Sequence, residues 1–364
     1  MSLALDAAGA PAVVIARSQL RSFCADALQA AGAAAPAAQT CAQSLVAADE
    51  RGVHSHGSLR LGVYVDRLRA GSIDGRATPV AERDVGAVAV LDARAGLGIA
   101  AAAAAIDLAV ERAARHGVGV VGVRNSHHCG MLAWLVQRAT DHGCAALAMS
   151  NADAQVAPWG ARAKFLGTNP MAIGVPTAEQ PFIIDFATSV AAHAKIKAAA
   201  ERGEAIPEGW AVDAEGRATT DPRLALAGAL LPFGGPKGAG LSIAIELLAG
   251  LLPGGQVGPD IVPLYERLAQ PQQVGHFFVV FDVAVFGERE TFLRRAAQTL
   301  QRVRELPAAH GVDRIWVPGE IEQGRAAAAP AAPLALPDVT GAELRRTAAL
   351  LGLALPEASV DGRR

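Results

Sequence analysis

The sequence has few aromatic side chains: they make up 4% of its 364 residues, although 51% of the residues are hydrophobic. Alanine supplies much of the hydrophobic share. We therefore expect a large core built from small side chains and close backbone packing. The length is enough for one large domain or two ordinary ones.

The sequence also lacks an excess of either charge, with a formal net charge of −2 and a pI of about 6.5. Without a basic face, nucleic acid is not an expected partner. No apolar run reaches the roughly 18 residues that suggest a membrane span. Residues 1–20 have no positive region ahead of their apolar residues. We therefore expect no membrane partner and no secretory signal in this stretch.

Cysteine is scarce, and the four cysteines, Cys24, Cys41, Cys129 and Cys144, show no paired spacing. Unpaired cysteines suit a reducing cytoplasm, which is the expected location. The histidines form no HExxH motif, and no acidic cluster accompanies them. We therefore expect no metal site.

Helical and strand patterns alternate along the chain, which predicts an α/β or α+β protein. The first 70 residues are mostly helical in pattern, and Ser18 is expected to cap the first helix. A capping box of Thr340 and Glu343 is expected to open the last helix. Further expected helices cover residues 98–116, 188–202, 237–252 and 288–304, and expected strands cover residues 85–91, 118–123, 145–150, 172–175, 182–185 and 275–282.

Gly117, Gly119 and Gly122 spell the GxGxxG pattern of dinucleotide-binding proteins. The Rossmann fingerprint needs a strand, then the glycine turn, then a helix. Here a helix precedes the glycines and a strand contains them. We therefore interpret Gly117 as a helix C-cap and make no argument for a Rossmann fold.

The most informative stretch is residues 50–60, Glu-Arg-Gly-Val-His-Ser-His-Gly-Ser-Leu-Arg. It places His56 and Arg60 four residues apart, so one helical turn separates them if the helix continues or restarts after Gly57. A guanidinium can hold a carboxylate by two hydrogen bonds while the histidine exchanges a proton with the neighbouring oxygen. Taken alone, the stretch also fits a capped helix end with a surface arginine.

Four other stretches could carry chemistry. Residues 125–130 follow a strand and precede a helix, so they either bind an anion or form an ordinary turn. Residues 167–170, Gly-Thr-Asn-Pro, form a turn. Asp185 ends a strand, and it either caps a helix or orients a catalytic histidine. Residues 233–240 form a glycine-rich loop around Lys237, which could hold a phosphate, a ribose or a carboxylate.

Together these segments resemble the malate/L-lactate dehydrogenase-like family of NAD(P)-dependent oxidoreductases, which is distinct from the Rossmann-type lactate and malate dehydrogenases. The resemblance runs from about Ser18 to Glu320. It rests on an ordered set of motifs: Arg51-Gly-Val-His-Ser-His-Gly57 with Arg60, Asn125-Ser126 with His128 and Gly130, Gly167-Thr-Asn-Pro170, Asp185-Phe-Ala-Thr-Ser189, Ile206-Pro-Glu-Gly-Trp-Ala211, Thr219-Thr-Asp-Pro222, Gly234-Gly-Pro-Lys-Gly238 and Pro318-Gly-Glu320.

The resemblance implies a non-Rossmann α/β fold, α+β-like, with a mostly antiparallel or mixed sheet flanked by helices. It implies a helical N-terminal part, residues 1–82, that packs with C-terminal helices in residues 283–364. A central domain, residues 83–282, would bind cofactor and substrate. It also implies a homodimer. Family members act on malate, lactate, sulfolactate, ureidoglycolate, diketogulonate or cyclic imino acids.

Site residues are carried over by motif. His56 would be the general acid/base, with Ser55 and Asp185 in its relay. Arg60 and Thr168 would hold the substrate carboxylate. The NAD or NADP cofactor would be lined by His128, Cys129, Gly130, Met131, Leu132, Phe186, Ala187, Pro236, Lys237, Pro318, Gly319 and Glu320.

The chain departs from the family pattern at three positions. His54 stands where an acidic residue is usual, which should lower the pKa of His56. Cys129 replaces a common phenylalanine, and without an activating neighbour we expect a packed thiol rather than a nucleophile. Ala152 stands where a hydroxyl is frequent.

The predicted reaction is hydride transfer between a nicotinamide cofactor and C2 of a small 2-hydroxy or 2-oxo acid. Two alternatives stay open. A cyclic ketimine reductase would use the same residues on a C=N bond. A ligand-binding protein would keep the scaffold without turnover.

Overall fold

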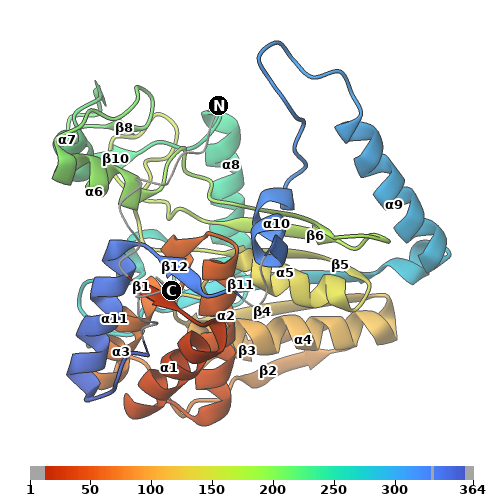
Figure 1. The fold of residues 1–364 in the computed structure, drawn as a ribbon, viewed down its shortest axis with the longest axis horizontal. Coiled ribbons are helices and arrows are strands. Elements are labelled where there is room, and N and C mark those ends of the chain that lie inside the picture. The colour runs from red at the N-terminus through yellow and green to blue at the C-terminus, as the bar shows by residue number, and fades with distance from the viewer. Residues whose placement is uncertain (1–12, 329–331, 357–364) are drawn as a thin grey trace, which may run out of the picture. The chain divides into compact units, whose positions relative to one another are not determined.

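The computed structural model describes residues 13–328 and 332–356, which divide into two compact units (Figure 1). Unit 1 comprises residues 1–76 and 320–364, and unit 2 comprises residues 77–319. The boundaries inferred from the sequence fall after residues 82 and 282. In the structure, residues 77–82 and 283–319 belong to unit 2 instead. The second of these segments contains the long helix α9 (Arg289–Arg304).

Unit 1 is mainly helical, and both ends of the described chain contribute to it. Its strands β1 (Val13–Ile15) and β12 (Leu334–Leu336) pair antiparallel. Its helices are α1 (Arg17–Ala30), α2 (Ala35–Glu50), α3 (Leu61–Arg69), α10 (Glu320–Ala328) and α11 (Asp338–Leu351). The helical N-terminal part expected from the sequence is present.

Two helix starts in unit 1 differ from the expectation. Helix α1 begins one residue before Ser18, after Ala16, and no side chain caps it. Helix α11 begins at Asp338 after Pro337, so Thr340 is buried within the helix and forms no capping box. A proline with an extended backbone starts this helix without a hydroxyl cap.

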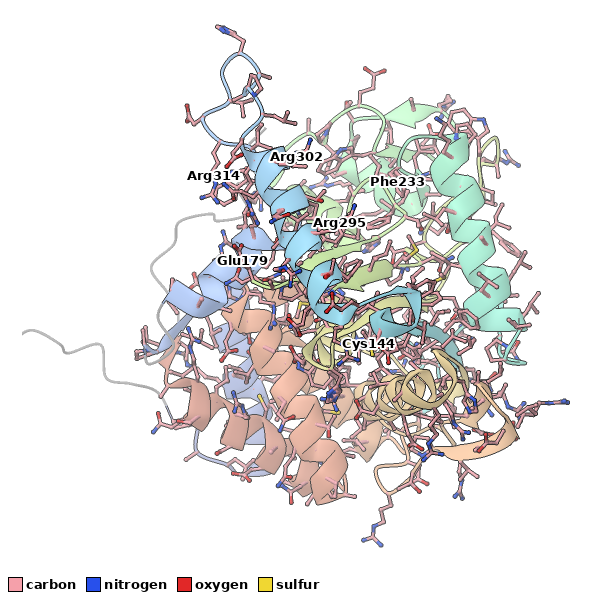
Figure 2. All side chains as sticks on the ribbon, turned by 90° about the vertical axis from the view of Figure 1, so that its right-hand side faces the viewer. Cys144, Glu179, Phe233, Arg295, Arg302 and Arg314 are labelled. Carbon is pink, nitrogen blue, oxygen red and sulfur yellow. The ribbon has the colours of Figure 1, made fainter. Side chains whose placement is uncertain are left out.

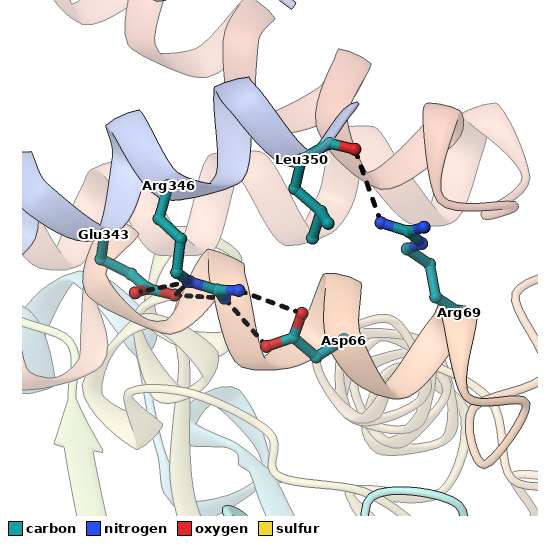
Figure 3. A network of polar contacts seen from close by, with 5 residues as sticks. All are labelled: Asp66, Arg69, Glu343, Arg346 and Leu350. Atoms are coloured by element: carbon teal, nitrogen blue, oxygen red, sulfur yellow. Dashed lines mark hydrogen bonds and ion pairs between the residues drawn. The ribbon is translucent and has the colours of Figure 1, made fainter. Parts of the chain in front are cut away.

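Helices α3 and α11 are joined by a charged cluster around Arg346 (Figure 3). Its guanidinium donates to both carboxylate oxygens of Asp66 at 2.8 and 3.3 Å and to Glu343 on its own helix. Gly62 allows this approach, because a Cβ there would lie 1.5 Å from Glu343 Oε1. The side chain of Arg346 is 44% exposed, so the cluster stabilises unit 1 by only about 1 kcal/mol or less.

Unit 2 is built on a mixed sheet of seven strands. Its order is β2-β3-β4-β11-β5-β6-β7, and only β3 and β4 pair parallel. This confirms the expected non-Rossmann fold class. The strands are β2 (Val80–Val85), β3 (Val88–Asp92), β4 (Val118–Ser126), β5 (Cys144–Ser150), β6 (Met171–Val175), β7 (Phe182–Phe186) and β11 (Val274–Asp282). The single strand expected over residues 85–91 is wrong, because a turn at Gly86 separates β2 from β3.

Small residues explain how the helices cover this sheet. Helix α4 (Gly98–His116) packs against β4 and β11, and helix α5 (Leu132–Asp141) packs against β5 and β6. Gly117 ends α4 in the left-handed conformation, as predicted. A Cβ at Gly119 would lie 1.9 Å from the carbonyl oxygen of Ala109, so this glycine serves close packing of strand on helix.

Unit 2 also contains a small three-stranded sheet, which lies apart from the seven-stranded one (green, Figure 1). It comprises β8 (Ala211–Val212), β9 (Ala218–Thr219) and β10 (Ala229–Leu230), beside helices α6 (His193–Arg202) and α7 (Pro222–Ala227). Helix α6 begins after Ala192, so the expected start at residue 188 is wrong. The hydroxyl of Thr188 donates to the carbonyl of Thr168 instead of capping a helix.

The helix expected over residues 237–252 is helix α8 (Pro236–Ile245) followed by a turn of π-helix, η3 (Glu246–Leu251). It is not buried on all sides. Ile243, Leu247 and Leu251 recur every four residues and are 43%, 51% and 53% exposed.

In α9, Arg295 and Arg302 lie along the helix, and both are exposed (Figure 2).

Among the described residues, no helix is long and apolar enough to cross a membrane, and no cluster of side chains could hold a metal ion. All four cysteines are buried and unbonded to one another.

Candidate active site

The histidine motif lies in unit 1, in a tight loop after helix α2. Gly52, with φ +73°, turns the chain out of the helix. Two short 3-10 turns follow, η1 (His54–His56) and η2 (Ser58–Arg60), and α3 then continues the helical path. The chain therefore restarts as a helix after Gly57, but the extended backbone of this glycine places His56 and Arg60 in two successive turns.

Within this loop, His56 has a hydroxyl partner and a cationic neighbour. Ser55 Oγ lies 2.9 Å from His56 Nδ1. The guanidinium Nε of Arg60 donates to the carbonyl of Ser55 over 2.6 Å. Burial and, secondly, the Arg60 cation lower the pKa of His56 to about 4. The lowered pKa was expected, but its cause was assigned to His54.

His54 faces a carboxylate that the sequence reasoning missed. Its Nδ1 lies 2.9 Å from Asp49 Oδ1, and Asp49 Oδ2 accepts a hydrogen bond of 2.8 Å from the backbone N–H of Ser58. Asp49 is 3% exposed. It therefore holds both ends of the five-residue loop whose middle residue is His56. The signal available in the sequence was an aspartate in the last turn of a helix, three residues before Gly52.

Gly57 makes room for that carboxylate. A Cβ at this position would lie 2.0 Å from Asp49 Oδ1. The glycine has φ −86°, so the requirement is one of space and not of backbone conformation.

In unit 2, Asp185 lies at the end of β7 and serves a helix start. Its Oδ2 accepts a hydrogen bond of 2.8 Å from the backbone N–H of Ala133, in the first turn of α5. A carboxylate there is favourable because helix N-termini attract negative charge. The capping alternative for Asp185 is thus present, although the helix is α5 and not the one that follows in sequence. This contact also takes up an N–H group that could have bound a phosphate.

The segment between β4 and α5 makes the predicted strand-to-helix turn. The N–H of His128 donates to Gln272 Oε1 over 3.1 Å, and Gly130 has φ +76°. Cys129, Met131 and Leu132 are each at most 3% exposed, so in this structure they support the turn from the core.

Cys129 is a packed thiol. Burial raises its pKa to about 12, while a hydrogen bond with Ser150 acts in the opposite direction. A thiol in this environment is not a nucleophile at neutral pH.

Three further segments of unit 2 meet at the end of β7. The backbone N–H of Thr188 donates to the carbonyl of Thr168 over 2.8 Å, and Phe233 N donates to the carbonyl of Thr188 over 3.0 Å. The rings of Phe186 and Phe233 meet edge to face, with centroids 5.8 Å apart. The predicted residues Thr168, Asp185, Phe186 and Ala187 therefore lie beside the glycine-rich loop.

That loop is formed as a cationic helix start. Gly234 and Gly235 have φ of +57° and +63°, which side-chain-bearing residues rarely adopt. Pro236 and the exposed Lys237 then open α8. N–H groups of a first helical turn and a lysine suit the diphosphate of a dinucleotide, so the residues present fit a nicotinamide cofactor. Pro318 and Gly319 end unit 2, whereas Glu320 starts α10 in unit 1.

A second histidine, His276 in β11, is fully buried between neighbouring strands. Its Nδ1 lies 2.9 Å from Ser150 Oγ, and its Nε2 lies 2.8 Å from Ser126 Oγ. Burial lowers its pKa to about 3. It is a neutral bridge across three strands, and the sequence reasoning did not identify it.

Residues 15–345 match the family described as malate/L-lactate dehydrogenase. A malate dehydrogenase of Pyrococcus abyssi is 34% identical over 85% of this chain and 86% of its own length. An NADP(+)-dependent (2R)-3-sulfolactate dehydrogenase of Chromohalobacter salexigens is 38% identical over 72% and 79%. An NAD(+)-dependent ureidoglycolate dehydrogenase of Escherichia coli O157:H7 is 34% identical over 86% and 90%.

Solved structures are similar over nearly the whole chain. The sulfolactate dehydrogenase of Methanocaldococcus jannaschii has a TM-score of 0.88 and 32% identity, covering 94% of this chain and 98% of its own. The delta1-piperideine-2-carboxylate reductase of Pseudomonas syringae has a TM-score of 0.83 and 33% identity, covering 92% and 99%.

Proposed function

This chain belongs to the malate/L-lactate dehydrogenase family, and from that membership we propose that it transfers hydride between NAD or NADP and C2 of a small 2-hydroxy or 2-oxo acid. Such an enzyme is an oxidoreductase whose substrate carries a carboxylate beside the reacting carbon. The observation that supports the proposal most is the loop around His56. In this loop the hydroxyl of Ser55 contacts Nδ1 of His56, and Arg60 lies next to both residues.

Each residue has a proposed role. Arg60 and Thr168 hold the substrate carboxylate, and Arg60 does so as a planar donor of paired hydrogen bonds. His56 exchanges a proton with the substrate oxygen at C2 as the hydride moves. Ser55, through its contact with Nδ1, fixes the ring orientation of His56. Asp185 stabilises the cationic form of His56.

The nicotinamide supplies the hydride chemistry when it is bound. The residues proposed to line it are His128 to Leu132, Phe186, Ala187, Pro236, Lys237 and Pro318 to Glu320. Lys237 is proposed to pair with a phosphate, which is supported by its exposure at the start of α8.

The same residues could reduce a C=N bond, so a cyclic ketimine reductase is the second candidate. The similarity to the piperideine carboxylate reductase supports it. Both candidate substrates carry a carboxylate for Arg60. They differ in whether His56 protonates an oxygen or a nitrogen.

The test is oxidation of NADH and NADPH by the purified protein with pyruvate, oxaloacetate, 2-oxoglutarate, sulfopyruvate, diketogulonate and piperideine carboxylate. Turnover on one acid identifies the reaction, substrate and cofactor together. His56→Ala should lower kcat/KM by about 10²- to 10⁴-fold. His142→Ala, at an exposed histidine, is the matched control and should change little. Cofactor binding with no turnover on any acid would instead support a ligand-binding protein.

We also propose a cytoplasmic homodimer. The exposed apolar stripe of Ile243, Leu247 and Leu251 supports the dimer, because such a stripe on a helix is typical of an interface. Four free cysteines support a reducing location. Light scattering of the wild type and of Leu247→Glu tests the dimer, which the charged variant should weaken.

A further inference from the structure

Glu246 is a buried carboxylate with no role in the reaction proposed above. It is 4% exposed, and it begins the π-helical turn η3 directly after α8. Such π turns are frequent at functional sites because they redirect side chains within a helix. The side chain of Glu246 is directed at the turn of residues 167–170, which carries Thr168.

Both oxygens of Glu246 accept hydrogen bonds from N–H groups. Oε1 accepts from the backbone of Gly167 over 3.3 Å and from Asn169 Nδ2 over 2.9 Å. Oε2 accepts from Asn151 Nδ2 over 3.2 Å and from the backbone of Gly258 over 3.3 Å. Four such bonds can compensate for the loss of hydration of a buried anion.

The two asparagines cannot turn over to offer oxygens instead. Asn169 Oδ1 accepts from Ala152 N over 3.2 Å, and its Nδ2 also donates to the carbonyl of Ser242 over 3.0 Å. Asn151 is fixed in the same way, since its Oδ1 accepts from Gly275 N and its Nδ2 donates to the carbonyl of Gln256, both over 2.8 Å. Each amide therefore presents N–H to Glu246, which must accept only.

The turn also contains a strained residue. Asn169 has φ +31°, an uncommon backbone conformation for a side-chain-bearing residue. Such conformations persist when the surrounding contacts fix them from several sides. Thr188 fixes one side by binding the carbonyl of Thr168, and Glu246 fixes the other through Gly167 and Asn169.

We propose that Glu246 is a positioning residue for substrate binding: its ionised carboxylate holds the turn of residues 167–170 in the conformation in which Thr168 receives the substrate carboxylate. The inference rests on the proposed function of Thr168. Glu246 acts through the turn, because its own carboxylate is buried.

Glu246→Gln tests this with almost no change of size. The glutamine NH2 group would face either the N–H groups of Gly167 and Asn169 or those of Asn151 and Gly258. One of these two pairs of donors would then lose its acceptor, so the turn is held less tightly. KM for the acid substrate should rise at least tenfold, while KM for the cofactor changes less than twofold. Hydrogen exchange in a peptide covering residues 165–171 should become faster. Val280→Ala, a cavity variant at a fully buried residue of β11, is the control for a loss of stability without this effect.

A Glu246→Gln protein with unchanged acid KM and unchanged exchange would overturn the proposal. The proposal would also be overturned if Glu246→Gln lowered the melting temperature and the active fraction as Val280→Ala does, while both KM values stayed unaltered. If Glu246→Gln does not fold, Asn169→Gly replaces it. Glycine tolerates the positive φ but lacks the amide, so the acid KM should again rise. Wild-type protein without turnover on any acid would refute the proposed function, and the exchange experiment would still decide whether Glu246 holds the turn.

Discussion

Asp49 Oδ1 lies 2.9 Å from His54 Nδ1, and through this pair the end of helix α2 is joined to the loop that carries His56. The other oxygen of Asp49 accepts from Ser58 N. Asp49→Ala should release both ends of the loop and leave Ser58 N–H buried without its partner. We expect kcat/KM to fall about 10- to 100-fold, in line with the 1–3 kcal/mol penalty of such a loss.

Asp49→Asn is the informative comparison for that variant. Asparagine can accept from Ser58 with its oxygen and donate to the unprotonated Nδ1 of His54, so most activity should return. Kinetics of the two variants with the same acid separate the loop's geometry from the charge of Asp49. Equal losses in both variants would show that the charge is what matters.

Gly57→Ala should act on the same loop by collision. The new Cβ would lie 2.0 Å from Asp49 Oδ1, and the carboxylate has no freedom to withdraw while it binds Ser58. We expect a loss of at least 10-fold in kcat/KM. Gly324→Ala in α10 meets nothing within 4 Å and should leave activity intact. Full activity of Gly57→Ala would contradict the loop geometry described above.

The pH dependence of turnover should follow His56, whose pKa is lowered to about 4. Oxidation of the hydroxy acid needs neutral His56 as the base, so kcat/KM should stay level from pH 8 to about pH 5 and fall below that. Reduction needs the protonated form, so its kcat/KM should decrease as pH rises above about 4. An NMR titration of the imidazole checks the assignment without turnover. In Arg60→Gln, loss of the cation should raise the pKa.

His276 should make the protein sensitive to acid. Its folded pKa of about 3 lies below the ordinary value near 6.5, so unfolding takes up a proton between these pH values. Stability from neutral His276 is complete above about pH 6.5 and is lost as pH falls toward 3. The slope is about 1.4 kcal/mol per pH unit for one proton. Urea unfolding of His276→Gln at pH 5 and 7 should show a pH slope smaller by that one proton. An unchanged slope would show that other groups dominate.

The order of motifs along the chain was enough to predict the fold class and the family. The rejection of the GxGxxG pattern is supported by the structure, because Gly119 sits where α4 packs on β4. Helix starts were predicted less well. Ser18 and Thr340 have the right chemistry for caps, but the observed cap positions are Ala16 and Pro337, two and three residues earlier.

The carboxylates that hold the site loops could not be found from the sequence. Asp49 and Glu246 lie within helical patterns, where an acidic residue is usually expected on a solvated face. Asp49 binds the ring of His54 and the backbone N–H of Ser58 across the loop that follows its helix. Glu246 binds backbone N–H groups and two asparagines far away in sequence, Asn151 and Asn169. Only the tertiary fold shows that these two carboxylates are buried. The proposed roles of His56, Arg60, Thr168 and Asp185 remain predictions for the kinetic tests above.

The pairing of β1 with β12 has a consequence for how the chain reaches its structure. Unit 1 is assembled from two segments, and the whole of unit 2 is threaded between them. During synthesis, β1 and the first helices are therefore made long before β12, the strand with which β1 pairs. Closing so long a loop as a random coil has a high entropic cost, and a folded insert restricts the distance between its ends. Unit 2 should thus fold first and bring the two segments of unit 1 together. A destabilising substitution in the core of unit 2 would therefore delay the folding of both units.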